Sequence, residues 1–188
     1  MKKIIYIIVA IIAVMAVVWA LSGKSNAKNS NVLIVYFSAT GNTAGVAQNL
    51  AAATGADLFE IQPLAIYSAE DLNWQNDKSR ASVEMADRSS RPEVASRVEN
   101  MDQYSIVFVG FPIWWGREPS VIDTFLESYD FNGKTIVPFA TSGSTPTTTE
   151  AAESIRTIVP NANVVDGARF PIDVSADELN TWAGEFIK

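Results

Sequence analysis

The chain has 188 residues, 48% of them hydrophobic, and a formal net charge of −7, with neither cysteine nor histidine. Its length suits one compact domain. The two missing residue types exclude disulfides, thiol nucleophiles, Ser-His-Asp triads, zinc fingers, and haem or iron–sulfur centres ligated by Cys or His. Any redox function must therefore come from a bound cofactor.

The N-terminus contains an unbroken run of 18 apolar residues, 4–21, after Lys2 and Lys3. A bilayer-spanning helix needs about 20 apolar residues and the apolar part of a cleaved signal about 7–15, so the run favours a membrane anchor. Small residues leave cleavage after Ala27 open. We expect the following domain to be extracytoplasmic, anchored to the cell membrane or secreted after cleavage. The sequence thus divides into a signal or anchor in 1–22, a polar linker in 23–30 and a folded domain in 31–188.

The acidic residues are confined to the folded part. All 21 Asp and Glu follow position 28, with only 10 of the 14 Lys and Arg, which gives this part a net charge of −11. Such a field repels phosphate backbones and no basic stripe interrupts it, so we expect no nucleic-acid binding. The field would steer partners with a basic docking face, although a solvated acidic surface without a partner is the commoner explanation.

Short apolar runs alternate with helix-like segments along the folded part. Continuous apolar runs are typical of strands that are covered on both faces. In chain order the expected strands are Val32–Phe37, Asp57–Ile61, Ile106–Phe111, Thr135–Ala140 and Ala162–Val165. Because helices separate most of them, the strands are expected to form a parallel sheet with helices on both sides.

Apolar residues at helical spacing predict a helix after every strand except the second. Pro119 suits a first helical turn, and Ser175 with Glu178 forms a capping-box pattern. The segment 62–101 is less regular, although residues 79–88 could be helical, and such long segments are often functional or mobile. Its polar and aromatic residues could cover a cofactor, form an interface or simply pack within the loop; they are Tyr67, Asp71, Asn73 and Trp74.

Ligands bind such sheets beyond the carboxyl ends of the strands. After the first strand come Ser38, Thr40, Gly41, Asn42 and Thr43, directly before a helix. Helix N-terminal N–H groups and hydroxyls favour a phosphate. Neither G-x-G-x-x-G nor G-x-x-x-x-G-K-[ST] is present, so a monophosphate fits better than a dinucleotide or a triphosphate. The alternative is that Thr40 or Asn42 merely caps the helix.

The loop after the third strand contains adjacent tryptophans. It consists of Pro112, Ile113, Trp114, Trp115 and Gly116. The indole rings could be core residues at a strand end, or they could stack on a large flat ligand. Gly116 would allow backbone conformations that other residues avoid.

The loop after the fourth strand is small and polar, with Thr141, Ser142, Gly143 and Ser144. Taken alone, it is typical of a linker with a helix cap. Together with the other two loops, it would supply donors and acceptors for the polar edge of a planar ring.

These three loops resemble those of the flavodoxin family, over about residues 31–188. The most specific part is the S/T-x-T-G-x-T signature, which Ser38, Thr40, Gly41 and Thr43 match. The loop with two tryptophans is similar to the one that covers the isoalloxazine ring in a bacterial flavodoxin-like branch. The resemblance implies a short-chain flavodoxin: an α/β fold with a doubly wound five-stranded parallel sheet, order 2-1-3-4-5, and helices on both faces.

The resemblance also implies that the domain binds FMN. In that case Ser38, Thr40, Asn42 and Thr43 hold the phosphate, Trp114 or Trp115 stacks on the ring, and 141–144 line its pyrimidine side. The family usually has a second stacking aromatic, a Tyr in the later loop, and no aromatic closely follows Thr141 here. No catalytic side chain and no metal ligand are expected.

The leading functional hypothesis is a one-electron carrier between redox partner proteins, in which FMN does the chemistry and the protein sets the potentials. The resemblance implies that the Trp115–Gly116 peptide can turn toward the reduced ring. The acidic field and apolar stacking should disfavour the fully reduced anion. Two alternatives remain open: an FMN-dependent NAD(P)H:quinone-type reductase on the same fold, and a non-redox module that binds another ligand or a partner.

Overall fold

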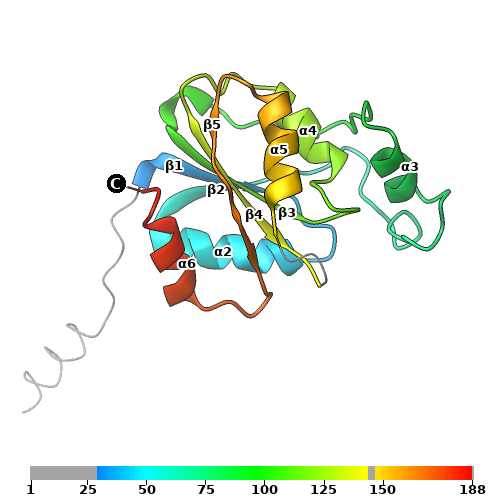
Figure 1. Ribbon diagram of the computed structural model, residues 1–188, viewed down its shortest axis with the longest axis horizontal. Coiled ribbons are helices and arrows are strands. Elements are labelled where there is room, and N and C mark those ends of the chain that lie inside the picture. The colour runs from blue at the N-terminus through cyan, green and yellow to red at the C-terminus, as the bar shows by residue number, and fades with distance from the viewer. Residues whose placement is uncertain (1–28, 144–146, 188) are drawn as a thin grey trace, which may run out of the picture.

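Helices and strands alternate along the chain, as the apolar pattern predicted. The computed structural model describes residues 29–143 and 147–187, and its sheet lies between two helical layers (Figure 1). The strands are β1 (Asn29–Tyr36), β2 (Ala56–Glu60), β3 (Ile106–Pro112), β4 (Thr135–Thr141), β5 (Asn163–Val164) and β6 (Ala168–Phe170). The helices are α2 (Asn42–Thr54), α3 (Arg80–Ala86), α4 (Ser120–Glu127), α5 (Thr149–Ile158) and α6 (Ala176–Ala183), with a 3-10 turn at Met101–Gln103.

The sheet has the predicted strand order. It runs β2-β1-β3-β4-β5 with every neighbouring pair parallel, and β6 also pairs with β4. Strand β1 therefore lies between β2 and β3, and the direction of winding reverses there. Such a switch point is where open α/β sheets bind ligands, because loops from the two sides separate.

The fifth strand position is split into β5 and β6, where a single strand was predicted. Residues two apart in a strand direct their backbone groups to the same side, and Val165 N donates to Ile136 O across this edge. Pro138 lies two residues after Ile136, so it faces the same edge of the sheet. It has no N–H to donate to a strand that would pair there. A Cβ on Gly167 would lie 1.8 Å from Pro138 O, so only glycine allows the chain to approach so closely.

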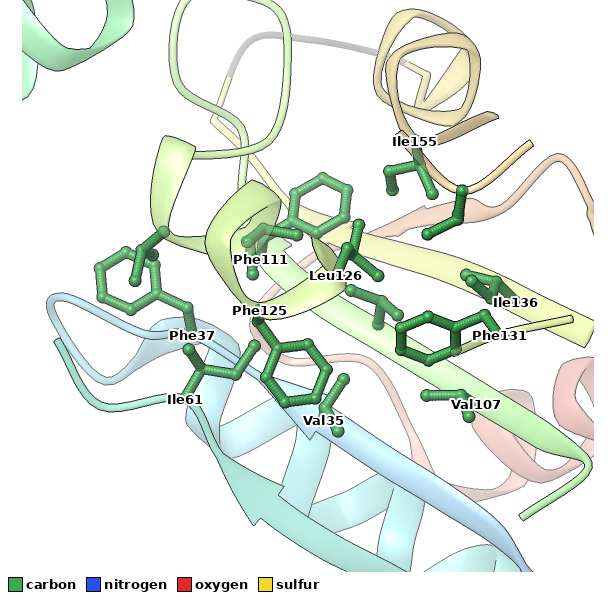
Figure 2. Close-up of a cluster of buried hydrophobic side chains, with 14 of the residues drawn as sticks. Val35, Phe37, Ile61, Val107, Phe111, Phe125, Leu126, Phe131, Ile136 and Ile155 are labelled. Atoms are coloured by element: carbon green, nitrogen blue, oxygen red, sulfur yellow. The ribbon is translucent and has the colours of Figure 1, made fainter. Parts of the chain in front are cut away.

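The central strands bury both faces, which explains why their sequences show no polar alternation. Leu33 and Val35 of β1 belong to the core under α4 and α5, whereas Val32 and Ile34 belong to the core under α2 and α6. Figure 2 shows the first core, where side chains of β1, β3 and β4 pack together with Phe125 and Leu126 of α4. In Figure 1 these two helix pairs cover opposite faces of the sheet, and α3 lies apart at the end of the molecule.

The starts of α3, α4 and α6 agree with the sequence to within a residue, whereas α2 begins at Asn42, inside the loop that was expected to precede it. Ser79 caps α3 by accepting from Ser82 N, and Ser175 caps α6 by accepting from Glu178 N at 3.2 Å. Pro119, expected inside the first turn of α4, is instead its N-cap residue in an extended conformation. The fixed φ of proline suits both positions.

The first strand begins at Asn29, within the stretch expected to be a linker. Asn29 N donates to Gly55 O at 2.9 Å, so backbone pairing extends the strand despite its polar side chains. The expected signal or anchor in 1–22 lies outside the described residues. Within residues 29–143 and 147–187, no helix is long and apolar enough to cross a membrane.

Candidate functional site

The carboxyl ends of β1, β3 and β4 border a cavity of about 930 Å³, within the size range of small-molecule sites. All three predicted loops reach it. Of the predicted site residues, the cavity is lined by Ser38, Thr40, Asn42, Thr43, Pro112, Ile113, Trp114, Trp115, Thr141, Ser142 and Gly143. Gly41 and Gly116 belong to these loops without lining the cavity, and Ser144 lies outside the described residues.

The first loop presents the N-terminus of α2 to the cavity. Gly41 is the N-cap residue, with φ 90 and ψ −16, and no side chain caps the helix there. The alternative in which Thr40 or Asn42 caps α2 is therefore wrong, because glycine takes the left-handed cap position. The first turn also contains no acidic residue. Its amides are available to an anion that enters the cavity.

Two buried hydroxyls connect the first and third loops. Thr43 Oγ1 and Thr141 Oγ1 are 2.9 Å apart, and both side chains are buried. The bond joins the first turn of α2 to the end of β4, two segments that are 98 residues apart in sequence. It fixes the spacing of the two polar walls of the cavity.

The second loop is a tight turn closed by two backbone hydrogen bonds. Trp114 N donates to Arg117 O at 2.9 Å, and Arg117 N donates to Trp114 O at 3.1 Å. Both central residues have positive φ, 47 for Trp115 and 88 for Gly116, as in a type I′ turn. For tryptophan this conformation costs about 1–2 kcal/mol, so the surrounding structure must impose it.

The two tryptophans have different surroundings. Trp114 packs edge-on against Phe37 and Tyr67, with ring centroids 5.6 and 5.4 Å away. Trp115, at the tip of the turn, is 53% exposed. One indole is thus held rigidly in the cavity wall, whereas the other is free to cover a ligand.

Tyr67, whose role the sequence left open, supports Trp114 from behind. Its hydroxyl donates to Glu84, and the Arg80 guanidinium lies over its ring, 4.0 Å from the centroid. Arg80 Nε also binds Glu84 Oε1 at 2.6 Å. Burial and the bond to Glu84 raise the pKa of Tyr67 well above its usual range, so the phenol stays neutral.

Further lining residues comprise Ala39 of the first loop and residues from segments that were not predicted to belong to the site. They are Ala39, Leu72, Trp74, Ala81, Arg169, Pro171, Ile172 and Asp173. Trp74 was noted as a possible cover, and it is 70% exposed. No sequence pattern marked the residues after β6 as site residues, because β6 itself was not predicted.

Charge is sparse in the cavity. Among the described lining residues only Arg169 and Asp173 are charged, and Arg169 Nη1 donates to Ser142 O at 3.4 Å. Within the described residues no cluster of three or more acidic groups could hold a metal. The cavity therefore offers backbone amides, hydroxyls and aromatic surface, with one charged residue of each sign and the cation beside the third loop.

Comparisons with known proteins agree with this geometry. A family model described as Flavodoxin matches residues 31–186. A provisionally named flavoprotein from Bacteroides eggerthii has 42% sequence identity and a TM-score of 0.79, over 85% of this chain and 98% of that one. Another from Bacteroides uniformis has 41% identity and a TM-score of 0.78, over 84% and 99%.

A more distant structure shares the fold. A Lactobacillus acidophilus flavoprotein, solved in complex with FMN, has 20% identity and a TM-score of 0.63, over 82% of this chain and 99% of that one. The comparison with curated proteins gave no match.

Proposed function

Because the chain belongs to the flavodoxin family, we propose that it binds FMN and carries electrons one at a time between redox partners. The observation that supports this best is the meeting of three loops at one cavity, where an uncapped helix N-terminus lies near two tryptophans. Those features match the phosphate and the ring of one ligand.

The donor set fits a phosphate monoester. Ser38, Thr40 and Asn42 line the cavity beside the first turn of α2, and hydroxyl, amide and backbone N–H groups all donate to phosphate oxygens. No lysine or arginine belongs to this loop. The helix dipole and neutral donors therefore supply the attraction, which suits a single phosphate better than a longer polyphosphate.

The aromatic and polar walls fit the ring. Trp114 is immobilised by its neighbours and Trp115 lies at the tip of an exposed turn, so the two indoles can pack on a flat ligand. Ser142 and Gly143 line the cavity on the third loop and can pair with polar ring edges. FMN supplies the redox chemistry when bound, so no side chain has to act as an acid or base.

The turn itself can respond to the ring. Gly116 follows Trp115 at positive φ, and glycine can rotate the intervening peptide at low cost. A carbonyl that turns toward the ring would accept a hydrogen bond from it. Trp115 and Gly116 would then separate the two reduction steps, which a one-electron carrier requires.

The experiment that tests this function uses the full chain. We expect FMN to lose its fluorescence on binding, and riboflavin to bind more weakly because it lacks the phosphate. A stepwise reductive titration followed by absorbance should resolve two one-electron steps. Failure to quench FMN fluorescence would favour a module that binds another ligand or a partner.

A reductase is the second candidate, and Arg169 is the observation that favours it. A cation in the cavity would stabilise negative charge on the ring and would therefore ease two-electron reduction. The same titration decides between the two candidates. A single two-electron step, together with rapid NAD(P)H oxidation by the purified chain, would support a quinone-type reductase and overturn the carrier proposal.

We also propose that the domain is extracytoplasmic, through the apolar run 4–21. The described chain begins at Asn29, at the amino end of β1, whereas the cavity lies beyond the carboxyl ends of the strands. An anchor before Asn29 would thus attach at the end of the sheet opposite the cavity. Mass spectrometry of the mature N-terminus, after separation of membrane and soluble fractions, distinguishes an intact anchor from cleavage after Ala27.

A further inference from the structure

A buried polar cluster lies behind the Trp114–Arg117 turn, outside the cavity. Glu118 is fully buried and Asp123 is 1% exposed. Arg117 Nη1 lies 3.6 Å from Glu118 Oε1 and 3.4 Å from Asp123 Oδ2. Two carboxyl groups therefore share one guanidinium in a site with almost no access to water.

The cluster connects elements that are far apart in sequence. Ser154 of α5 donates to Glu118 Oε1 and accepts from Arg88 Nη2, the latter at 2.7 Å. Arg91 Nη1 lies 3.7 Å from Asp123 Oδ2. The start of α4 is thus tied to α5 and to the segment after α3.

Two oxygens of the cluster have no hydrogen-bond partner. Glu118 Oε2 and Asp123 Oδ1 are both buried and unpaired, although the two side chains interact with each other. An ionised carboxylate only accepts hydrogen bonds, so two ionised groups would leave both oxygens unsatisfied. A proton between them would satisfy both, because the protonated oxygen donates to the other.

Burial favours this proton, whereas the neighbouring guanidinium groups and the Ser154 hydroxyl oppose it. Burial raises the pKa of Glu118 to about 8 and also raises the pKa of Asp123. The charged groups that face the pair are Arg117 beside it, and Arg88 and Arg91 from the segment after α3. From α5 the pair meets the neutral Ser154.

We propose that Glu118 and Asp123 share one proton at neutral pH, and that Glu118 is a positioning residue for the Trp114–Arg117 turn. Arg117 links the two, because its backbone closes the turn with Trp114 while its guanidinium is held by the carboxyl pair. Loss of the proton places two like charges in a dry site and pulls the guanidinium toward them. The turn then loosens, and with it the wall formed by the tryptophans.

The first test uses the full chain without ligand. The variants are Glu118→Gln, which keeps a donor without charge, and the control Glu153→Gln on the exposed side of α5. Amide hydrogen exchange of Trp114 and Arg117 is compared at pH 6.5 and 9.5, after correction for intrinsic rates. We expect protection to fall at least tenfold in the wild type and in the control, and to stay constant in Glu118→Gln. If exchange in the wild type and in Glu118→Gln depends on pH in the same way, the proposal of a shared proton is overturned.

The second test measures FMN affinity of the same proteins, and this part rests on the proposed function. The Kd of the wild type should rise at least threefold between the two pH values, whereas that of Glu118→Gln should not. Ionisation of FMN itself affects the Kd of every variant equally, so it does not alter the comparison between variants. A pH-dependent exchange with constant affinity overturns the positioning role. If the wild type binds no FMN, the proposed function fails, and the exchange data still decide the inference.

Discussion

The carboxylate of Glu150 lies against the backbone of Gly116, so that a Cβ added to Gly116 would be 2.7 Å from Glu150 Oε2. The first turn of α5 thus packs onto the turn that presents Trp115. Gly116 also has φ 88, which other residues adopt only with strain. The backbone conformation therefore requires glycine at this position, whereas the exposed Glu150 carboxylate can move aside for a Cβ.

Gly116→Ala should weaken FMN binding about fivefold or more, since the left-handed conformation alone costs alanine about 1 kcal/mol. Fluorescence quenching measures the Kd. Gly143→Ala is the matched control, because it lines the same cavity but has no neighbour within 4 Å of its added Cβ and no positive φ. Equal losses in the two variants would show that the geometry of the turn is not what matters.

Removing one hydroxyl of the Thr43–Thr141 pair should destabilise the domain by about 1–3 kcal/mol, because the other hydroxyl is left buried without its partner. Thr141→Val and Thr43→Val test this in urea denaturation. The double variant should lose less than the sum of the two, by about 1 kcal/mol. Strictly additive losses would mean that the two hydroxyls do not depend on each other.

Much of the architecture could be predicted because the strands are buried on both faces. The runs Val32–Phe37, Ile106–Phe111 and Thr135–Ala140 need no polar face, so their composition alone indicates strands, and their order follows from the family resemblance. The split fifth strand could not be predicted. It depends on Pro138 meeting Gly167 across the sheet edge, a contact between residues that are distant in sequence.

The same limit applies to the site. The loops after β1, β3 and β4 were identified because each directly follows a predicted strand. Arg169 and Ile172 reach the cavity only because β6 pairs with β4, and Leu72 reaches it from the irregular segment. Nothing local in the sequence marks these residues. The buried partners Glu118 and Asp123 were missed for a related reason: charged residues at a helix start are usually solvated, and burial here comes from α5 and the segment after α3.

The stability of the domain should fall as pH rises from about 4.5 to about 8, through the titration of Glu118. Its pKa is raised from 4.5 to about 8 by burial, so the folded state holds a proton that the unfolded state releases in this window. The stabilisation is complete below the lower pH value and is lost as pH approaches the upper one. Titration of one proton changes the free energy of unfolding by at most about 1.4 kcal/mol per pH unit.

Glu118→Gln should reduce that slope, since glutamine does not titrate and only Asp123 of the pair can still bind a proton. Urea denaturation at several pH values, compared with the exposed control Glu153→Gln, isolates the contribution of Glu118. If Glu118→Gln keeps the wild-type slope, another group is responsible for the pH dependence.

Arg169 should raise the reduction potential of bound FMN, against the effect of the acidic domain. Each electron added to the ring adds negative charge, which a cation in the cavity wall stabilises. Because Arg169 is exposed, we expect about 1 kcal/mol or less, which corresponds to roughly 40 mV for one electron. Arg169→Gln should therefore shift the reduction potential to more negative values by tens of millivolts. The shift should be smaller in 1 M salt, because dissolved ions screen the charge of Arg169 over a shorter distance.

Arg156→Gln is the matched control, because Arg156 is paired with Asp166 at 2.6 Å and does not line the cavity. It removes the same charge from the domain, so it measures the general field alone. A potential that moves equally in both variants would assign the effect to net charge. An unchanged potential, combined with weaker binding of FMN but not of riboflavin, would place the guanidinium at the phosphate end, and the ring would then have to lie with its polar edge away from Ser142.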